Sequence, residues 1–310
     1  MLYIRMASLD DVKGIVEVHC SGVDKWYKWV DGRRIEASYD ELSVLDRWGH
    51  GGPWMSIETC AIHINYVLVH NQYPLVALLD GKIVGELELY IGKEKGVLGK
   101  TAFIDILEVH RDYRRRGIGR SLVNKAIEIA KERNCDTVSV WPAKEAVGFY
   151  KKCGFNTIAY NIVNAELDIE NIKPHSVSYD VKEFPSNYNV LEDTWFISPR
   201  IESSFTAWIK SRWKYAVEEE VVKTIEGYIP GLQTAFIIES LWMNKDTASL
   251  YLWIKDVASL PEAIDTMLEI ARNAGFKKLR LIIDKNIYER YVKNYQHKII
   301  EQEIVLSIKL

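Results

Sequence analysis

Arginine and glycine crowd into one short stretch of the chain, Arg114–Arg120, which reads RRRGIGR. Guanidinium groups form forked hydrogen bonds to phosphate oxygens, and glycines let a ligand come close to backbone N–H groups. Such a stretch directly before a helix predicts an anion site, with a pyrophosphate as the natural ligand. On composition alone, a structural turn with a solvated basic surface explains the stretch equally well.

The flanking residues predict that this stretch joins a strand to a helix. Thr101–Val109 is apolar and partly β-branched, which is typical of a buried strand. After the glycines, apolar residues recur at helical spacing at Leu122, Ala126, Ile129 and Ala130. No Lys-Ser or Lys-Thr follows the glycines, which excludes a Walker loop, and Leu122 stands where the dinucleotide-binding fingerprint needs a glycine.

A second group of residues with chemical potential lies downstream. Val138–Trp141 predicts a strand, and Glu145–Cys153 predicts a short helix with Tyr150 on its apolar face and Gly154 as its C-terminal cap. A tyrosine hydroxyl can donate a proton to a departing group. By spacing alone, a tyrosine that fills the core is the simpler interpretation.

Taken together, these segments resemble the GNAT superfamily of N-acetyltransferases. Arg114–Gly119 has the R-x-x-G-x-G form of the family's acetyl-CoA-binding signature, and Leu107–Arg114 looks like its L-x-V-x-P-x-Y-R approach, with Arg111 in place of the proline. Ala146–Phe155 looks like the family's A-x-x-x-Y-x-K-x-G-F segment. One departure is Ala143, which stands where the family commonly has an asparagine that binds the pantetheine arm.

The resemblance implies a mixed α/β GNAT fold and an N-acetyltransferase. Such an enzyme moves an acetyl group from acetyl-CoA to a primary amine, in a small molecule or a peptide, by direct attack in a ternary complex. Tyr150 would protonate the leaving thiolate, and the backbone of Val109 would hold the thioester carbonyl. The residues implied to bind acetyl-CoA are Leu107, Glu108, Val109, Arg114, Arg115, Arg116, Gly117, Ile118, Gly119, Arg120 and Ser121.

Direct attack by an amine also needs a group that takes up its proton. Asp105 shares a strand face with Val109 by the period of two, and it stands where many amine acetyltransferases of this family carry a carboxylate. Glu86 and Glu88 are alternatives, on a hairpin that is predicted around the turn Asp80-Gly81. A structural or solvated role is the competing interpretation of Asp105.

Between the first helix and this hairpin, where the family shapes its acceptor pocket, the sequence is unusually aromatic. The residues concerned are Trp26, Tyr27, Trp29, Trp48 and Trp54, with Arg33, Arg34 and His50 nearby. An aromatic wall can bind a hydrophobic or cationic substrate, and core packing explains the same residues equally well. A lone histidine does not make a metal site, so no metal is expected.

The second half of the chain repeats the predicted order of helix, strand, helix and strand. Ser259 and Glu262 predict a capping box, and strands are predicted at Leu279–Ile283 and, by alternation, over 304–310, with a short helix at Ile287–Tyr295 between them. No glycine or arginine precedes the first of these helices, and Asp256 there would repel a phosphate.

We therefore predict two tandem GNAT-like domains. Residues 1–168 form the domain with the acetyl-CoA site, and residues 169–310 form a degenerate GNAT-like domain without a phosphate loop. The polar, proline-containing stretch 168–186 reads as the end of a strand and a linker. An unrelated α/β accessory domain is the alternative for the second half.

Composition limits the class of protein. The chain has 310 residues, 48% of them hydrophobic, and a net charge of −3, which gives no general reason to bind nucleic acid or an anionic membrane. It shows no signal-peptide pattern and no apolar run long enough for a membrane span, and its four cysteines are scattered, so a cytoplasmic protein with free thiols is expected.

Two other functions remain open at this stage. One is a non-catalytic acyl-CoA-binding sensor. The other is a modifier associated with nucleic acid, which only the arginine cluster favours, and the cofactor would itself occupy that cluster. The sequence names neither the amine acceptor nor an oligomeric state.

Overall fold

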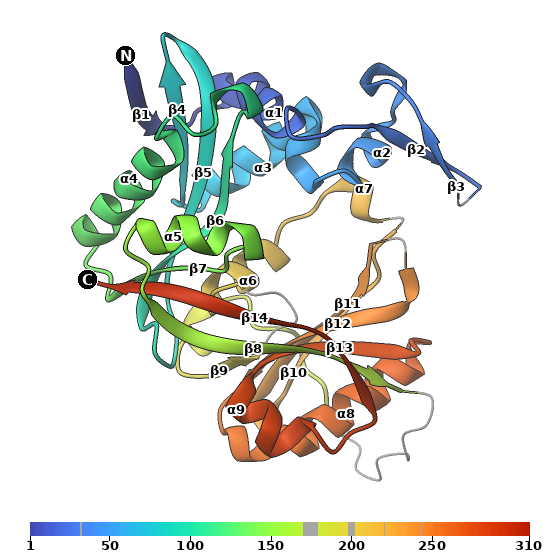
Figure 1. Cartoon of the computed structure of the whole chain (residues 1–310). Coiled ribbons are helices and arrows are strands. Elements are labelled where there is room, and N and C mark those ends of the chain that lie inside the picture. Colours follow the sequence, from blue (N-terminus) through green and yellow to red (C-terminus); the bar gives the residue numbers. More distant parts are fainter. Residues whose placement is uncertain (32, 170–178, 198–201, 220, 243) are drawn as a thin grey trace. The chain divides into compact units, whose positions relative to one another are not determined.

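The computed structural model describes residues 1–31, 33–169, 179–197, 202–219, 221–242 and 244–310 (Figure 1). Residues 170–178 of the predicted linker stretch 168–186 lie outside the described residues. The chain divides into two compact units, and each contains residues from both sides of residue 168. Unit 1 comprises Met1–Ile91, Ile104–Asn134 and Trp213–Glu218, and unit 2 comprises Gly92–Phe103, Cys135–Arg212 and Glu219–Leu310.

Unit 1 is built on an antiparallel hairpin with one further strand at either side. The strand order is β1 (Leu2–Met6), β4 (Tyr73–Leu79), β5 (Lys82–Lys93) and β6 (Lys100–Val109), of which β5 and β6 also have residues in unit 2. The β4–β5 turn has φ of +50° at Asp80 and +84° at Gly81, as the predicted type I′ turn requires.

Unit 1 contains helices, some of which pack against this sheet (Figure 1). They are α1 (Val12–Cys20), α2 (Val44–Trp48), α3 (Ile57–Val69), α4 (Ile118–Glu132) and α7 (Ala216–Glu219), and a small hairpin of β2 (Tyr27–Val30) and β3 (Arg33–Glu36) precedes α2. The core between α1, α3 and β4 contains Ile15, Ile64 and Val76, none of them exposed. Leu122 and Ala126, predicted from helical spacing, are the buried face of α4.

Unit 2 has a long mixed sheet. Its strand order is β7 (Thr137–Val140), β14 (His297–Lys309), β8 (Thr157–Asp168), β13 (Lys278–Asp284), β12 (Asn244–Ile254), β11 (Thr234–Leu241) and β10 (Thr224–Ile229), with β9 (Trp195–Ile197) paired to β12. Its helices are α5 (Val147–Lys152), α6 (Ser204–Ser211), α8 (Leu260–Asn273) and α9 (Lys285–Ile287). A π-helical turn, Tyr288–Val292, continues α9, so the helix predicted there is confirmed only in part.

Strands from the two halves of the sequence alternate within this sheet. Figure 1 shows β14 running along β8, and β14 lies between β7 and β8, with Ile308 opposite Val138. In turn, β8 lies between β14 and β13, with Ala165 opposite Leu281. The final strand, His297–Lys309, is thus much longer than the predicted 304–310. The prediction was too short because the first residues of the strand (HKIIEQE) are too polar to show the alternation of a half-buried strand.

At the junction before α8, the parallel strands β12 and β13 pair only from Thr247 to Ser249 of β12. Further along, β12 pairs with the short strand β9, so Leu252 lies opposite Ile197. The carboxylate of Asp256 accepts the N–H of Ala258 at 2.9 Å and begins a 3₁₀ turn ahead of the helix.

The predicted Ser259 capping box is wrong. Because the 3₁₀ turn already includes Ser259, its φ of −82° and ψ of 0° are near-helical, and its side chain caps nothing. Among the described residues, no helix is both long and apolar enough to cross a membrane.

Candidate active site

The Gly/Arg stretch of unit 1 forms the predicted strand–loop–helix. Strand β6 ends at Val109, and α4 begins at Ile118. Arg115 and Gly117 have positive φ values of +65° and +83°, which turn the backbone into the helix. Gly117 stands at the N-cap, where it has no side chain to occupy the first N–H groups of α4, and a Cβ there would meet nothing within 4 Å. Open space in front of a helix N-terminus suits an anionic group.

The arginines of this stretch divide into two roles. Arg114 turns back to the strand, where its Nη2 donates to Glu108 Oε1 at 2.7 Å and its Nε donates to the Val109 carbonyl at 3.0 Å. It therefore fastens the loop to the end of β6. Arg116 lies over the ring of Tyr113, 5.2 Å from the centroid, and the other two predicted donors, Arg115 and Arg120, are exposed.

The C-terminal end of α1 is tied to the same loop. The Arg111 N–H donates to Ser21 Oγ at 2.9 Å, and the Arg111 guanidinium donates to the Gly22 carbonyl at 3.0 Å and to Asp24 at 2.6 Å. His19, on the last turn of α1, is consequently held near the end of β6.

Two buried histidine–glutamate pairs stand side by side in unit 1. Glu86 and Glu88 lie on the same face of β5 and are not exposed at all. His19 from α1 donates to Glu86, and His63 from α3 donates to Glu88 at 2.9 and 3.0 Å. Sequence analysis placed the two carboxylates as alternatives but missed the histidines. The available signal was a polar residue, His19, on the apolar face of a helix.

Glu88 is fully satisfied by hydrogen bonds. Besides His63, Trp54 Nε1 donates to it at 2.8 Å and the Tyr90 hydroxyl at 2.7 Å. Burial opposes ionisation, but the neighbouring His63 and these hydrogen bonds outweigh it and lower the pKa of Glu88. The hydroxyl of Tyr215 completes the chain by donating to His63 Nδ1 at 2.7 Å.

Glu86 is much less well satisfied. Its Oε1 is buried and has no hydrogen-bond partner. Burial raises the pKa of the Glu86 carboxyl, and the hydrogen bond from His19 offsets only part of this effect.

Asp105 is half-buried on β6, and its charge is one of the causes that raise the pKa of Tyr90, after burial and Glu88. It thus lies beside the Glu88 end of the cluster. The Glu86 end is level with the end of β6, because a Cβ at Gly85 would lie 3.2 Å from the carbonyl oxygen of Glu108. Leu107, Glu108 and Val109 are all half-buried there.

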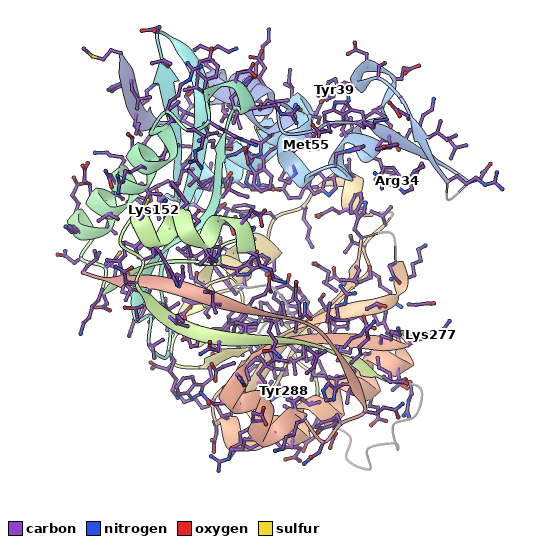
Figure 2. The ribbon with its side chains drawn as sticks, in the orientation of Figure 1. Arg34, Tyr39, Met55, Lys152, Lys277 and Tyr288 are labelled. Atoms are coloured by element: carbon purple, nitrogen blue, oxygen red, sulfur yellow. The ribbon has the colours of Figure 1, made fainter. Side chains whose placement is uncertain are left out.

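The aromatic region splits into two parts. Trp48 and Trp54 are buried, and Trp54 is committed to Glu88. Trp26 packs edge-on to Tyr39 at 5.1 Å, and the Arg34 guanidinium lies 4.3 Å from the ring centroid of Tyr27. Tyr39 and Arg34 are labelled in Figure 2. The latter part is a half-exposed cluster of rings.

Tyr150 belongs to unit 2, on the short helix α5 whose end is marked by Lys152 in Figure 2. The residue is 6% exposed, and its ring packs against Phe149 and Phe155 with centroids 5.0 and 5.5 Å apart. The predicted amphipathic helix is confirmed, and the ring is part of its packed face.

Comparison with known proteins decides the family. Residues 34–155 match the model of the acetyltransferase (GNAT) family. This segment of the chain is a GNAT domain.

Relatives of this chain include an uncharacterized N-acetyltransferase of Methanocaldococcus jannaschii, 44% identical over 88 residues that make up 26% of this chain and 37% of that one. The match thus spans little more than a third of that relative. The glucosamine 6-phosphate N-acetyltransferase of Schizosaccharomyces pombe is 26% identical over 115 residues, 35% of this chain and 95% of that one.

A solved structure resembles the whole chain. The tandem GNAT protein from the clavulanic acid biosynthesis pathway superposes with a TM-score of 0.53 at 15% identity, covering 100% of this chain and 98% of that one. The likeness confirms the predicted mixed α/β GNAT fold.

Proposed function

We propose that this GNAT protein transfers an acetyl group from acetyl-CoA to a primary amine of a small molecule or peptide, by direct attack in a ternary complex. The observation that carries the proposal is the open N-terminus of α4, reached through the positive φ values of Arg115 and Gly117. Exposed arginines beside free backbone donors favour the pyrophosphate of a CoA ester over other small anions.

Each part of the proposed site has its own role in binding or catalysis. The backbone from Gly117 to Ser121, with Arg115, Arg116 and Arg120, binds the pyrophosphate, and the backbone of Leu107–Val109 holds the acyl arm. Tyr150 protonates the leaving thiolate. Asp105 is the base that the sequence predicts. Residues 169–310 form a degenerate domain that binds no donor.

For the acceptor, we propose only a chemical class, a primary amine. The relative from S. pombe is named for an amino sugar phosphate, which is a primary amine. The half-exposed rings around Tyr27 and Trp26 suit the apolar body of an amine or its cationic form.

The test is thiol release from acetyl-CoA across a panel of amines and peptides. Tyr150→Phe is expected to keep the affinity for CoA and to lower kcat by roughly 10²-fold, the usual contribution of a positioned acid. Tyr291→Phe is the control, since it removes a tyrosine hydroxyl from the corresponding helix of the second half. Binding of acetyl-CoA without turnover on any amine would instead indicate a sensor, and equal rates for Tyr150→Phe would remove that residue from the mechanism.

A further inference from the structure

The two histidine–glutamate pairs of unit 1 have the same composition but differ in how completely they are bonded. In the Glu88 pair, the carboxylate accepts from three side chains, and both ring nitrogens of His63 are used. In the Glu86 pair, Oε1 is buried and has no partner, and His19 is bonded to a described residue through Nε2 alone.

This difference is not explained by exposure. Neither glutamate is exposed, and His19 and His63 are only 8% and 1% exposed. Leaving the buried carboxylate oxygen Oε1 of Glu86 without a partner costs free energy, and such a group in a native protein calls for an explanation. The Glu88 pair has the bonding of a structural element, whereas the Glu86 pair keeps an acceptor available.

The position of the Glu86 pair suits a role at the acyl group. Gly85, next to Glu86, lies against Glu108 at the end of β6, and the end of α1 that carries His19 is bonded to Arg111 of the loop. Asp105 precedes Val109 by four residues, which is about 13 Å along an extended strand. The pair is therefore nearer than Asp105 to the strand end that is proposed to hold the thioester.

We propose that His19, in place of the Asp105 that the sequence predicts, is the proton acceptor for the amine substrate, and that Glu86 is the positioning residue that orients His19 and stabilises its protonated form. The inference rests on the proposed acetyl transfer. Because Glu86 accepts from Nε2–H, the neutral ring presents the lone pair of Nδ1, the tautomer logic of a base oriented by a carboxylate.

The step balances as follows. An alkylammonium substrate gives one proton to His19 Nδ1 and becomes the neutral amine, whose nitrogen forms a bond to the acyl carbon. The C–S bond then breaks, and the sulfur takes the hydroxyl proton of Tyr150 and leaves as the thiol of CoA. The second amine proton restores the Tyr150 hydroxyl. The imidazolium of His19 returns its proton to solvent.

Other titratable groups surround the pair. Glu88 lies on the same strand, His63 and Cys60 face it from α3, and Cys20 follows His19 on α1. Burial, with the nearby carboxylates, raises the pKa of the Cys60 thiol, which therefore stays neutral and does not compete as a base.

The test is the pH dependence of kcat/KM with acetyl-CoA and the best amine of the panel. His19→Gln is expected to lower kcat/KM by roughly 10²-fold and to abolish its acidic limb. Glu86→Gln is expected to lower the plateau by about 10-fold and to move the acidic limb to lower pH, since the charge that favours the imidazolium is gone. Glu88→Gln is the matched control, expected to lower the melting temperature without moving the limb.

The result that overturns the proposal is an unchanged acidic limb in His19→Gln and Glu86→Gln, or a limb that only Asp105→Asn abolishes. Absence of turnover by the wild type with every amine would instead defeat the proposed function. If His19→Gln does not fold, ¹⁵N-histidine spectra of the wild type decide, because the Nδ1 signal of His19 must respond to added amine, and that of His63 must not.

Discussion

The hydroxyl of Tyr215 lies 2.7 Å from Nδ1 of His63, although 152 residues separate them in the sequence. Trp213 stacks on Tyr66 nearby, with centroids 5.4 Å apart and planes within 7°. The segment Trp213–Glu218 is thus part of the core of unit 1. One contribution of the second half of the chain is therefore structural: it completes the buried hydrogen-bond chain that ends at Glu88.

We expect Tyr215→Phe to lower the free energy of unfolding by about 1–3 kcal/mol, because it leaves His63 Nδ1 buried without a donor. Urea denaturation followed by fluorescence measures this. Tyr66→Phe is the control, since its hydroxyl bonds only the backbone of Lys214 in a more exposed place, and it should cost less. Equal losses for both variants would contradict the importance assigned to the buried chain.

Replacing both Gly117 and Gly119 by aspartate is expected to weaken CoA binding by roughly 10²-fold or more, because side chains and negative charge then occupy the space of the pyrophosphate. Calorimetric titration measures the affinity. Gly275→Asp is a matched control, because Gly275 also has positive φ, +91°, and open space around its Cβ position. It adds the same strain and charge at the end of α8, where no CoA is expected.

One CoA should bind per chain. In the second half, β9 pairs with β12 where that strand has parted from β13, and Asp256 already accepts a hydrogen bond at the turn into α8. A carboxylate in that place also repels phosphate. Titration of the full chain with CoA should saturate at one equivalent, and a second equivalent would disprove the degenerate character of this half.

Stability should fall as the pH rises from about 5 to about 7. Burial, opposed only by the N–H of Ser204, raises the pKa of Glu94 to about 7 from its ordinary 4.5. Over this range the unfolded chain loses the proton that the folded chain retains, which favours unfolding by roughly 3 kcal/mol in total.

Glu94→Gln should remove most of this slope, and Glu183→Gln, at an exposed position, should leave it in place. The check is urea denaturation of the three proteins at several pH values. If Glu94→Gln kept the wild-type slope, Glu94 would not be the cause of the pH dependence.

Local pattern was sufficient to predict the elements around the loop. The apolar run Thr101–Val109, the glycines after it and the spacing of Leu122 and Ala126 each depend on neighbours within one or two turns, and the structure has β6 and α4 in those places. The Asp80-Gly81 turn was predictable for the same reason.

Long-range pairing was not predictable in this way. Nothing local to His63 indicates that Tyr215 is its partner, and the polar start of β14 hides a strand that is recognisable only from its neighbours β7 and β8. The Ser259 capping box failed because a competing acceptor, Asp256, stood three residues earlier. Sequence patterns indicate which face of a helix or strand a residue lies on. Its hydrogen-bond or strand-pairing partner depends on how the whole sheet is assembled.

The place of β14 between β7 and β8 has a consequence for synthesis on the ribosome. Both neighbours emerge long before residues 297–309, so their facing edges stay unpaired while the intervening chain is made. Open strand edges invite pairing with other chains, and contacts this distant in sequence close slowly. The nascent protein should therefore depend on chaperones that shield strand edges, and premature termination anywhere before residue 297 should yield insoluble product rather than a functional fragment.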